Sequence, residues 1–266
     1  MTAPGIVVGA NGSATSTAAV RWAAAEAQLR GVGLDVVVAY QWRIPGRSFA
    51  SRGELVRTTG AHVREILDAA VNEARSSAEG VPVRGAAIVG DPVPVLLEAA
   101  TDADLLVVGG RGRGSPGPLL SPVTTQLAAY APSSVAVVRP GWSSDRRTVV
   151  VGVTESPGAS TTMGTAFEEA NLRRPATLLA VTAQTGPDRV LDQLAPWRGK
   201  YPEVPVVCHV ASGEPGAVLV EKSREAGLLV VGAGSHQDFE GLRLGPIRLH
   251  LLHHAECPVL IARDRR

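Results

Sequence analysis

Residues 102–140 read DADLLVVGGRGRGSPGPLLSPVTTQLAAYAPSSVAVVRP, with a glycine-rich stretch between two hydrophobic segments. The hydrophobic segments, residues 105–108 and 135–138, have the length and composition of buried strands. Between them, the glycines of residues 109–117 precede a helical pattern at residues 119–126. The stretch therefore predicts a strand, a loop large enough to surround a phosphate group, a helix that begins directly after the loop, and a second strand.

The residues before this stretch show the same alternation. Hydrophobic segments at residues 5–10, 34–40 and 81–89 alternate with helical patterns, one of which covers residues 61–79, whereas residues 41–60 read as irregular. Alternating strands and helices with short connections favour parallel strands joined by right-handed crossovers. We predict an α/β fold with a Rossmann-like, doubly wound sheet of five parallel strands in the order 3-2-1-4-5.

The second half of the chain repeats the first. Residues 149–153 correspond to residues 6–10, and residues 228–232 correspond to residues 105–109. Internal similarity of this kind indicates two copies of one fold. We predict two tandem domains, residues 1–142 and residues 143–266.

Composition argues against two classes of partner. A net charge of +1 gives little attraction to nucleic acid or to an anionic membrane, and 4% aromatic residues leave few side chains for stacking on bases. No hydrophobic run approaches the roughly 20 residues of a membrane-spanning helix. Cys208 and Cys257 lie in or beside hydrophobic segments, which indicates two buried free thiols and a cytoplasmic location.

The glycine-rich loop has the chemistry of an anion site. Glycine permits positive φ angles and close approach of the backbone, and the helix that follows provides free N–H groups. Arg111 and Arg113 add positive charge. In a sheet of this order, the loop after the fourth strand faces the turn after the first, here Asn11-Gly12-Ser13. We predict a ligand crevice between them; a glycine-rich surface loop without a ligand is the alternative.

These motifs resemble those of the universal stress protein family, and the resemblance covers essentially the whole chain, once in each half. The family pattern is G-x-x-G-(x)9-G-[S/T], together with an Asp-Gly-Ser after the first strand. In nucleotide-binding members the crevice holds ATP. The resemblance implies that the aspartate lies by the ribose, that the backbone after the second strand meets the adenine, and that the glycine loop cradles the phosphates.

The first half keeps part of this pattern. Gly109 and Gly112 are present, but Asn11 replaces the aspartate, and Ser121-Pro122 stands at the position of G-[S/T]. Asparagine still offers a hydrogen bond to a ribose hydroxyl, whereas proline lacks an N–H donor, which should weaken phosphate binding. The resemblance implies that the nucleotide-binding residues are Ala10, Asn11, Gly12, Ala39, Tyr40, Val108, Gly109, Arg111, Gly112, Ser121, Pro122, Val123 and Thr124.

The second half departs further from the pattern. Thr154-Glu155-Ser156 replaces Asp-Gly-Ser, and the loop contains Asp238 and Glu240, whose charges repel phosphates unless a metal ion intervenes. We therefore rank this site as the weaker of the two. By the same resemblance, its residues are Thr154, Val181, Gly232, Ser235, Gly245, Pro246 and Ile247.

Three other patterns point to chemistry that we set aside. Residues 112–117 match a dinucleotide fingerprint but follow a fourth strand rather than a first. Residues 250–257 hold three histidines and Cys257 at metal-ligand spacing, yet a His-Ala-x-Cys-Pro-Val ending is ordinary for the family, so we predict no metal site. No histidine is placed by the sequence to activate Ser13 as a nucleophile. We therefore predict no catalytic residue and no enzyme activity.

Two functional hypotheses remain open. The first is a stress-response regulatory protein that binds ATP or a related adenine nucleotide, with Mg²⁺, in the crevice between strands 1 and 4. The alternative is a nucleotide-free scaffold or interaction protein of the same family with degenerate binding motifs. Family members of this kind pair through their last strand, here residues 135–138 and 259–262. We expect the two halves to pair with each other in this way; a homodimer and an unidentified protein partner are also open.

Overall fold

The computed structural model describes residues 5–41, 52–110, 120–156, 158–182, 186–234 and 244–264. The strands in these ranges are β1 (Ile6–Gly9), β2 (Leu34–Tyr40), β3 (Val83–Val89), β4 (Leu105–Gly109), β5 (Ser134–Val138), β6 (Thr148–Gly152), β7 (Leu178–Thr182), β8 (Val206–Val210), β9 (Ala226–Gly232) and β10 (Val259–Ala262). The helices are α1 (Ala14–Arg30), α2 (Arg52–Ser77), α3 (Pro92–Ala99), α4 (Pro122–Tyr130), α5 (Ala159–Leu172), α6 (Pro187–Lys200), α7 (Pro215–Ser223) and α8 (Pro246–His254).

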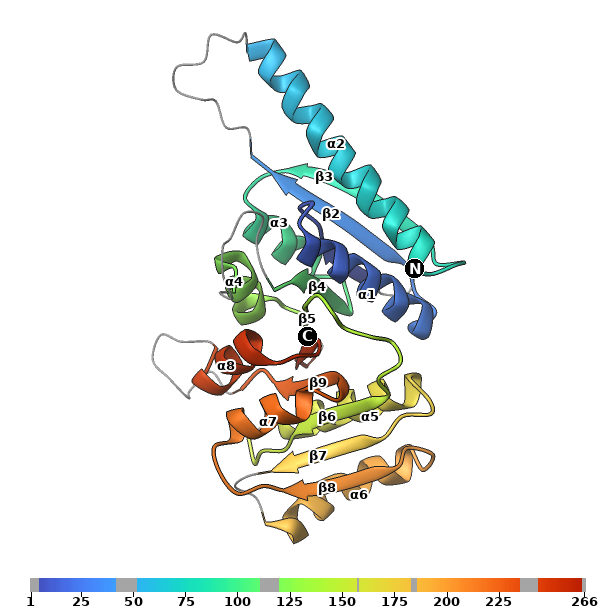
Figure 1. The fold of residues 1–266 in the computed structure, drawn as a ribbon, viewed down its shortest axis with the longest axis vertical. Helices are drawn as coiled ribbons and strands as arrows, with labels where there is room; N and C mark the ends of the chain where they lie inside the picture. Colours follow the sequence, from blue (N-terminus) through green and yellow to red (C-terminus); the bar gives the residue numbers. More distant parts are fainter. Residues whose placement is uncertain are drawn as a thin grey trace.

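The strands form one ten-stranded sheet in the order β3-β2-β1-β4-β5-β10-β9-β6-β7-β8. Within each half the order is 3-2-1-4-5 and all pairs are parallel, so the predicted fold class is confirmed. The expected pairing between the last strands joins the halves: β5 and β10 are neighbours and run antiparallel. Figure 1 shows the two halves one above the other along the sheet.

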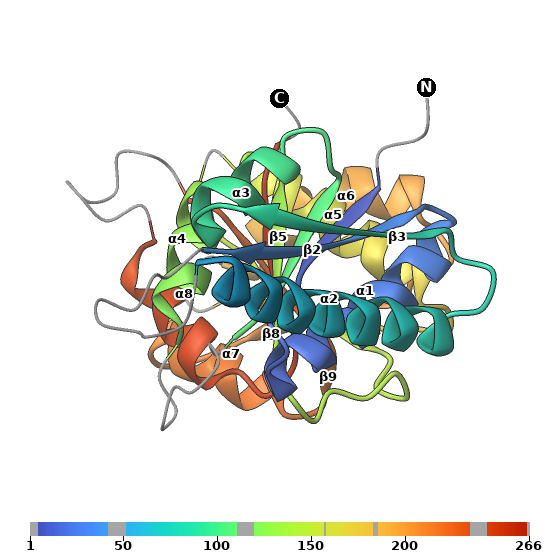
Figure 2. The same ribbon diagram turned by 90° about the horizontal axis from the view of Figure 1, so that it is seen from above.

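Helices cover both faces of the sheet (Figure 2), because its inner strands are hydrophobic on both faces. β4 buries all but its last residue, as expected for a strand inside a parallel sheet. One hydrophobic core, which includes Ile6 and Phe167, packs under α1, α2, α5 and α6. A second core, which includes Leu106 and Leu229, packs under α3, α4, α7 and α8. Within the described ranges, no helix is both long enough and hydrophobic enough to cross a membrane.

Helix α2 differs most from the sequence prediction. It runs Arg52–Ser77, so its first turns fall within residues predicted to be irregular. Pro45, Gly46 and Gly53 prompted that prediction. Of these, only Gly53 falls inside the helix, where a glycine costs about 1 kcal/mol relative to alanine. Packing of α2 against α1, β2 and β3 outweighs this cost. The second half is shorter at the same place, where α6 has 14 residues against 26 in α2.

The two cysteines lie in different surroundings, so the prediction of two buried thiols is wrong for one of them. Cys257 is buried, and burial raises the pKa of its thiol to about 12. Cys208 is exposed. It lies in β8, which is the edge strand of the second half and has a neighbour on one side only among the described strands. The composition of β8 is as hydrophobic as that of an inner strand, so the sequence does not show that β8 lies at the edge.

A buried ring of four charged side chains also joins the halves. Glu26 pairs with Arg30 on α1, and Glu169 on α5 pairs with Arg173, the C-cap residue of that helix. Each arginine also pairs with the glutamate of the other helix. Glu26 and Glu169 are 1% and 0% exposed. Burial opposes ionisation of Glu26, but Arg173 and Arg30 outweigh it and hold its pKa below the ordinary value. Burial, together with the charge of Glu26, raises the pKa of Glu169.

Two arginines reach across the junction from the ends of the paired strands. Arg139 follows β5 and donates hydrogen bonds to two carbonyls in the last turn of α8. Arg263 follows β10 and donates in the same way at the end of α4, where its Nε lies 3.0 Å from the carbonyl oxygen of Ala131. Since the last carbonyls of a helix lack partners within it, each half caps the final helix of the other.

Residues 139–147 connect β5 to β6 and contain the predicted domain boundary after residue 142, which stays a prediction. The connection is anchored on the first half, because the indole Nε1 of Trp142 donates a 3.3 Å hydrogen bond to the carbonyl of Ala18 in α1.

Candidate functional site

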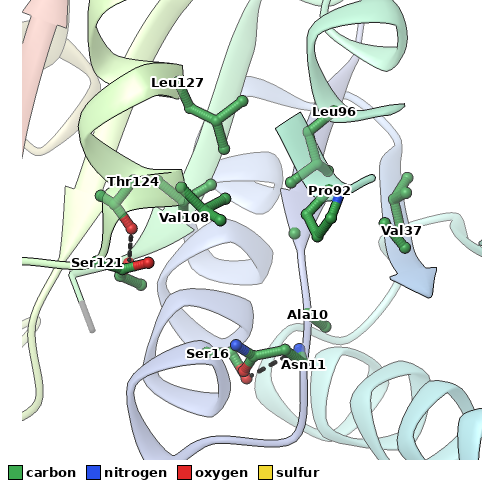
Figure 3. Close-up of a pocket in the computed structure, with 14 residues that line it drawn as sticks. Ala10, Asn11, Ser16, Val37, Pro92, Leu96, Val108, Ser121, Thr124 and Leu127 are labelled. Atoms are coloured by element: carbon green, nitrogen blue, oxygen red, sulfur yellow. Dashed lines mark hydrogen bonds between the residues drawn. The ribbon is translucent and has the colours of Figure 1, made fainter. Parts of the chain in front are cut away.

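A pocket opens at the C-terminal ends of β1 and β4 (Figure 3). These strands are neighbours, but one leads on to β2 and the other to β5, so the pocket lies at the topological switch point of the first half. Its volume is about 250 Å³. The lining comes from the ends of β1, β2 and β4 with the residues that follow β1, from the first turn of α1, and from α3 and α4. Its residues are Gly9, Ala10, Asn11, Ser16, Val37, Ala39, Pro92, Leu96, Val108, Gly109, Ser121, Val123, Thr124 and Leu127.

The structure brings together most of the residues predicted for the first site. The predicted residues in the lining are Ala10, Asn11, Ala39, Val108, Gly109, Ser121, Val123 and Thr124. Three others lie outside the lining: Gly12 in the turn after β1, Tyr40 at the end of β2, and Pro122 as the first residue of α4. Arg111 and Gly112 lie outside the described residues.

Asn11 directs one hydrogen-bonding group toward the pocket rim. Its side-chain oxygen accepts a 3.0 Å hydrogen bond from the N–H of Ser13, as in an Asx-turn. Its own N–H donates a 3.3 Å bond to the hydroxyl of Ser16. Among the described residues, the Nδ2 group of Asn11 donates to no acceptor. Asn11 therefore retains a donor for a ligand, whereas an aspartate would present only acceptors.

The first turn of α4 forms the opposite wall. Thr124 donates a 2.8 Å hydrogen bond to the carbonyl of Gly109, which fixes this turn against β4. Ser121 is the N-cap residue, but its side chain makes no capping hydrogen bond. Pro122 occupies the first helical position, where an N–H would lack an intrahelical partner in any case. The remaining N–H groups and the helix dipole favour an anion at this end of the pocket.

Part of the glycine pattern has a packing role. A Cβ at Gly109 would lie 2.8 Å from the backbone carbonyl carbon of Thr15 at the start of α1. A Cβ at Gly9 would lie 2.9 Å from the side chain of Leu96 in α3. The glycines thus let α1 and α3 approach the strands closely. Substituting Gly109 would disturb the packing of α1 as well as any ligand.

Sequence reasoning missed the hydrophobic floor of the pocket and one hydroxyl. The missed lining residues are Gly9, Ser16, Val37, Pro92, Leu96 and Leu127. Gly90-Asp91-Pro92 was a usable signal, because an aspartate followed by a proline is typical of a helix start, and α3 begins here at the same edge of the sheet as the loops. Gly9 also recurs in the second half as Gly152.

The second half places its predicted residues at the equivalent edge, but one unpredicted side chain lies among them. Gly245 is the N-cap of α8, followed by Pro246 and Ile247. Arg248 comes next, at the position of Thr124, and its Nη1 lies 3.4 Å from the carbonyl oxygen of Gly232. Of the other predicted residues, Thr154 follows β6, Gly232 ends β9, and Val181 is buried in β7. Ser235 lies outside the described residues.

Comparison with known proteins gives the same picture for both halves. The model of the universal stress protein family matches residues 5–139 and 175–263. A universal stress protein of Mycolicibacterium smegmatis is 30% identical over 288 residues, covering 98% of this chain and 97% of the relative. A universal stress protein of Mycobacterium tuberculosis is 31% identical over 302 residues, covering 97% of this chain and 95% of the relative.

A solved structure shares the fold along the whole chain. The crystal structure of a universal stress protein from Archaeoglobus fulgidus has a TM-score of 0.76 and 15% identity, and the match covers 98% of each chain. The matches to the family model and to these relatives extend over both halves. The chain therefore belongs to the universal stress protein family and contains the family's domain twice.

Proposed function

We propose that the protein binds an adenine nucleotide in the pocket of its first half and acts as a regulatory protein of the stress response. The observation that carries this proposal is the convergence of two helix N-termini, those of α1 and α4, on one pocket at the switch point. Helix N-termini favour negatively charged groups, and ligands of such sheets bind at this edge.

The lining divides into a hydrophobic part and a polar part, as a nucleotide requires. Val37, Ala39 and Leu96 offer a slot for the base, and the Nδ2 group of Asn11 is a donor for the ribose. The first turn of α4 supplies N–H groups for a phosphate. The volume of about 250 Å³ is below the roughly 300 to 1,000 Å³ of typical small-molecule sites, so a triphosphate would extend beyond the pocket.

The proposal includes no chemical step. Among the described lining residues, none carries a carboxylate, imidazole, thiol or amine that could act as a general base. We propose ATP with Mg²⁺ as the ligand, with AMP and cAMP as the related nucleotides to compare. We also propose a cytoplasmic location, because Cys208 and Cys257 are both free thiols and a reducing compartment keeps them so.

Isothermal titration calorimetry on nucleotide-free protein tests the proposal, with Val123→Glu as the diagnostic variant. Val123 lines the pocket in the first turn of α4, so a carboxylate there would repel the phosphates, and we expect binding to weaken at least about tenfold. Ile247→Glu is the matched control, because Ile247 occupies the same position in α8. A glutamate in the first turn suits either helix dipole, so neither variant should unfold the protein.

Two results would count against nucleotide binding. One is the absence of heat with ATP, AMP and cAMP on the unmodified protein. The other is equal weakening by Val123→Glu and Ile247→Glu. The first result would instead favour the nucleotide-free scaffold, for which Ser121-Pro122 in place of G-[S/T] is the supporting observation.

A further inference from the structure

The guanidinium of Arg248 lies among three glycines of the second half, Gly232, Gly234 and Gly245. Its Nη1 lies 3.4 Å from the carbonyl oxygen of Gly232, at the end of β9. A Cβ at Gly245 would lie 3.1 Å from its Nη2, and a Cβ at Gly234 would overlap the same group. Gly234 also has a φ of +82°, which favours glycine. The side chain therefore occupies space that two glycines leave open.

The first half shares only the strand glycine of this arrangement, because Arg111 and Ser121 stand at the positions of Gly234 and Gly245. Thr124 stands at the position of Arg248 and donates to the carbonyl of Gly109, the counterpart of Gly232. Its short side chain stops at that bond, and the pocket opens beside it. Ser121 replaces Gly245 as the N-cap residue. A Cβ at Gly245 would lie 3.1 Å from Nη2 of Arg248, so a serine at this position leaves less room for a guanidinium than a glycine does.

We propose that Arg248 closes the second-half site by filling it from within, so that the chain binds one nucleotide and not two. This inference rests on the proposed function of the first half. Gly245, which the family pattern provides for a phosphate, here makes room for the guanidinium. At these two positions, glycine and arginine (Gly245 and Arg248) therefore give a closed site, and serine and threonine (Ser121 and Thr124) give an open one.

The stoichiometry of binding tests the inference. Equilibrium dialysis with ATP and Mg²⁺ should give one ATP per chain for the unmodified protein. Arg248→Thr should give two, and Gly245→Ser combined with Arg248→Thr should also give two, because it copies the open form. Arg248→Lys keeps a long cationic side chain in the site and should stay at one. Ser121→Gly combined with Thr124→Arg should close the first site and give none.

Two further variants locate the added ATP. In the Arg248→Thr background, Ile247→Glu should remove the new site and Val123→Glu the original one. Circular dichroism and the thermal midpoint show whether each variant is folded, and Arg248→Ala replaces Arg248→Thr if the latter does not fold.

The outcomes separate this inference from the proposed function. One ATP for both the unmodified protein and the opened variants would overturn the role of Arg248 and leave the first site intact. Two ATP on the unmodified protein would also overturn it. No ATP on the unmodified protein but one on Arg248→Thr would support the inference and refute binding in the first half. No ATP on any folded variant would refute both.

Discussion

In the first half, Thr124 donates a 2.8 Å hydrogen bond to the carbonyl of Gly109, whereas at the matching position Arg248 lies 3.4 Å from the carbonyl of Gly232. The two helices that carry these residues both begin with a proline after the N-cap. The strand glycines and the hydrophobic side chains beneath them also match, as in Leu127 and Leu251. The two sites therefore differ mainly in their polar side chains.

This difference separates what the fold requires from what a ligand requires. Gly9 and Gly152 recur at the end of the first strand of each half, because neighbouring helices approach the backbone there. Asn11, in contrast, becomes Thr154, whose hydroxyl lies 2.9 Å from that of Ser156. A repeated domain keeps its packing positions under the same constraint in both copies, whereas a binding site can diverge in one copy while the other retains it.

The largest effect on stability is expected in the charged ring, where both halves contribute the same pair of residues. Glu26→Gln leaves Glu169 with two buried guanidinium groups and should lower the free energy of unfolding by about 4 kcal/mol at neutral pH. The pKa of Glu26 is held below its ordinary value of 4.5. The penalty should therefore be present above pH 4.5 and decline as the pH falls through the lowered pKa.

Glu169→Gln should lower the free energy of unfolding by less than Glu26→Gln does at neutral pH, and its penalty should grow rather than decline as the pH falls. Its pKa is raised above 4.5, so the stability it contributes is complete below 4.5 and is lost as the pH rises through the raised pKa. Urea unfolding of both variants between about pH 4 and pH 8 would measure the two profiles. Identical penalties with the same pH dependence would contradict the asymmetry between the halves.

The next largest effect on stability is expected from the leucines that lie beneath the two sites. Leu127 and Leu251 are both 0% exposed and belong to the same core, so Leu127→Ala and Leu251→Ala should each cost about 3 kcal/mol. Only Leu127 lines the open pocket. Chemical denaturation combined with calorimetry should therefore give similar losses of stability but weaker nucleotide binding for Leu127→Ala alone. Weaker binding in both variants would show that the loss follows from destabilisation.

The smallest effect is expected from the two crossing arginines. Arg263→Ala and Arg139→Ala each remove hydrogen bonds at a helix C-terminus, and each should lower stability by about 1 kcal/mol. Since Arg263 holds α4, whose first turn lines the pocket, only Arg263→Ala should also weaken nucleotide binding, by a few-fold. Thermal unfolding and titration of the pair would measure this. Unchanged affinity in Arg263→Ala would show that α4 keeps its position without the cap.

The strands and their order could be predicted from sequence because hydrophobic runs, turn residues and the repeat all point to one fold. The exposure of side chains on an edge strand could not be predicted. Cys208 is exposed, although the composition of its strand, β8, resembles that of an inner strand. In the site, Asn11, Ser121 and Thr124 were identified through the resemblance to the family pattern. Leu96 and Leu127 were missed, because which helix residues face the crevice depends on how α3 and α4 pack. Arg248 was missed because only the folded chain shows its side chain turning back over Gly234.

The antiparallel contact between β5 and β10 sets a limit on self-association. Each of these strands already has a neighbour on both sides, so neither offers an edge to another molecule. The free edges of the sheet are β3 and β8 at its far ends, and on β3 Arg84 pairs with Asp35 of β2, a charged feature that discourages edge-to-edge growth. The hydrogen-bonding edges of β5 and β10 are thus both occupied within the chain, and any homodimer must use other surfaces.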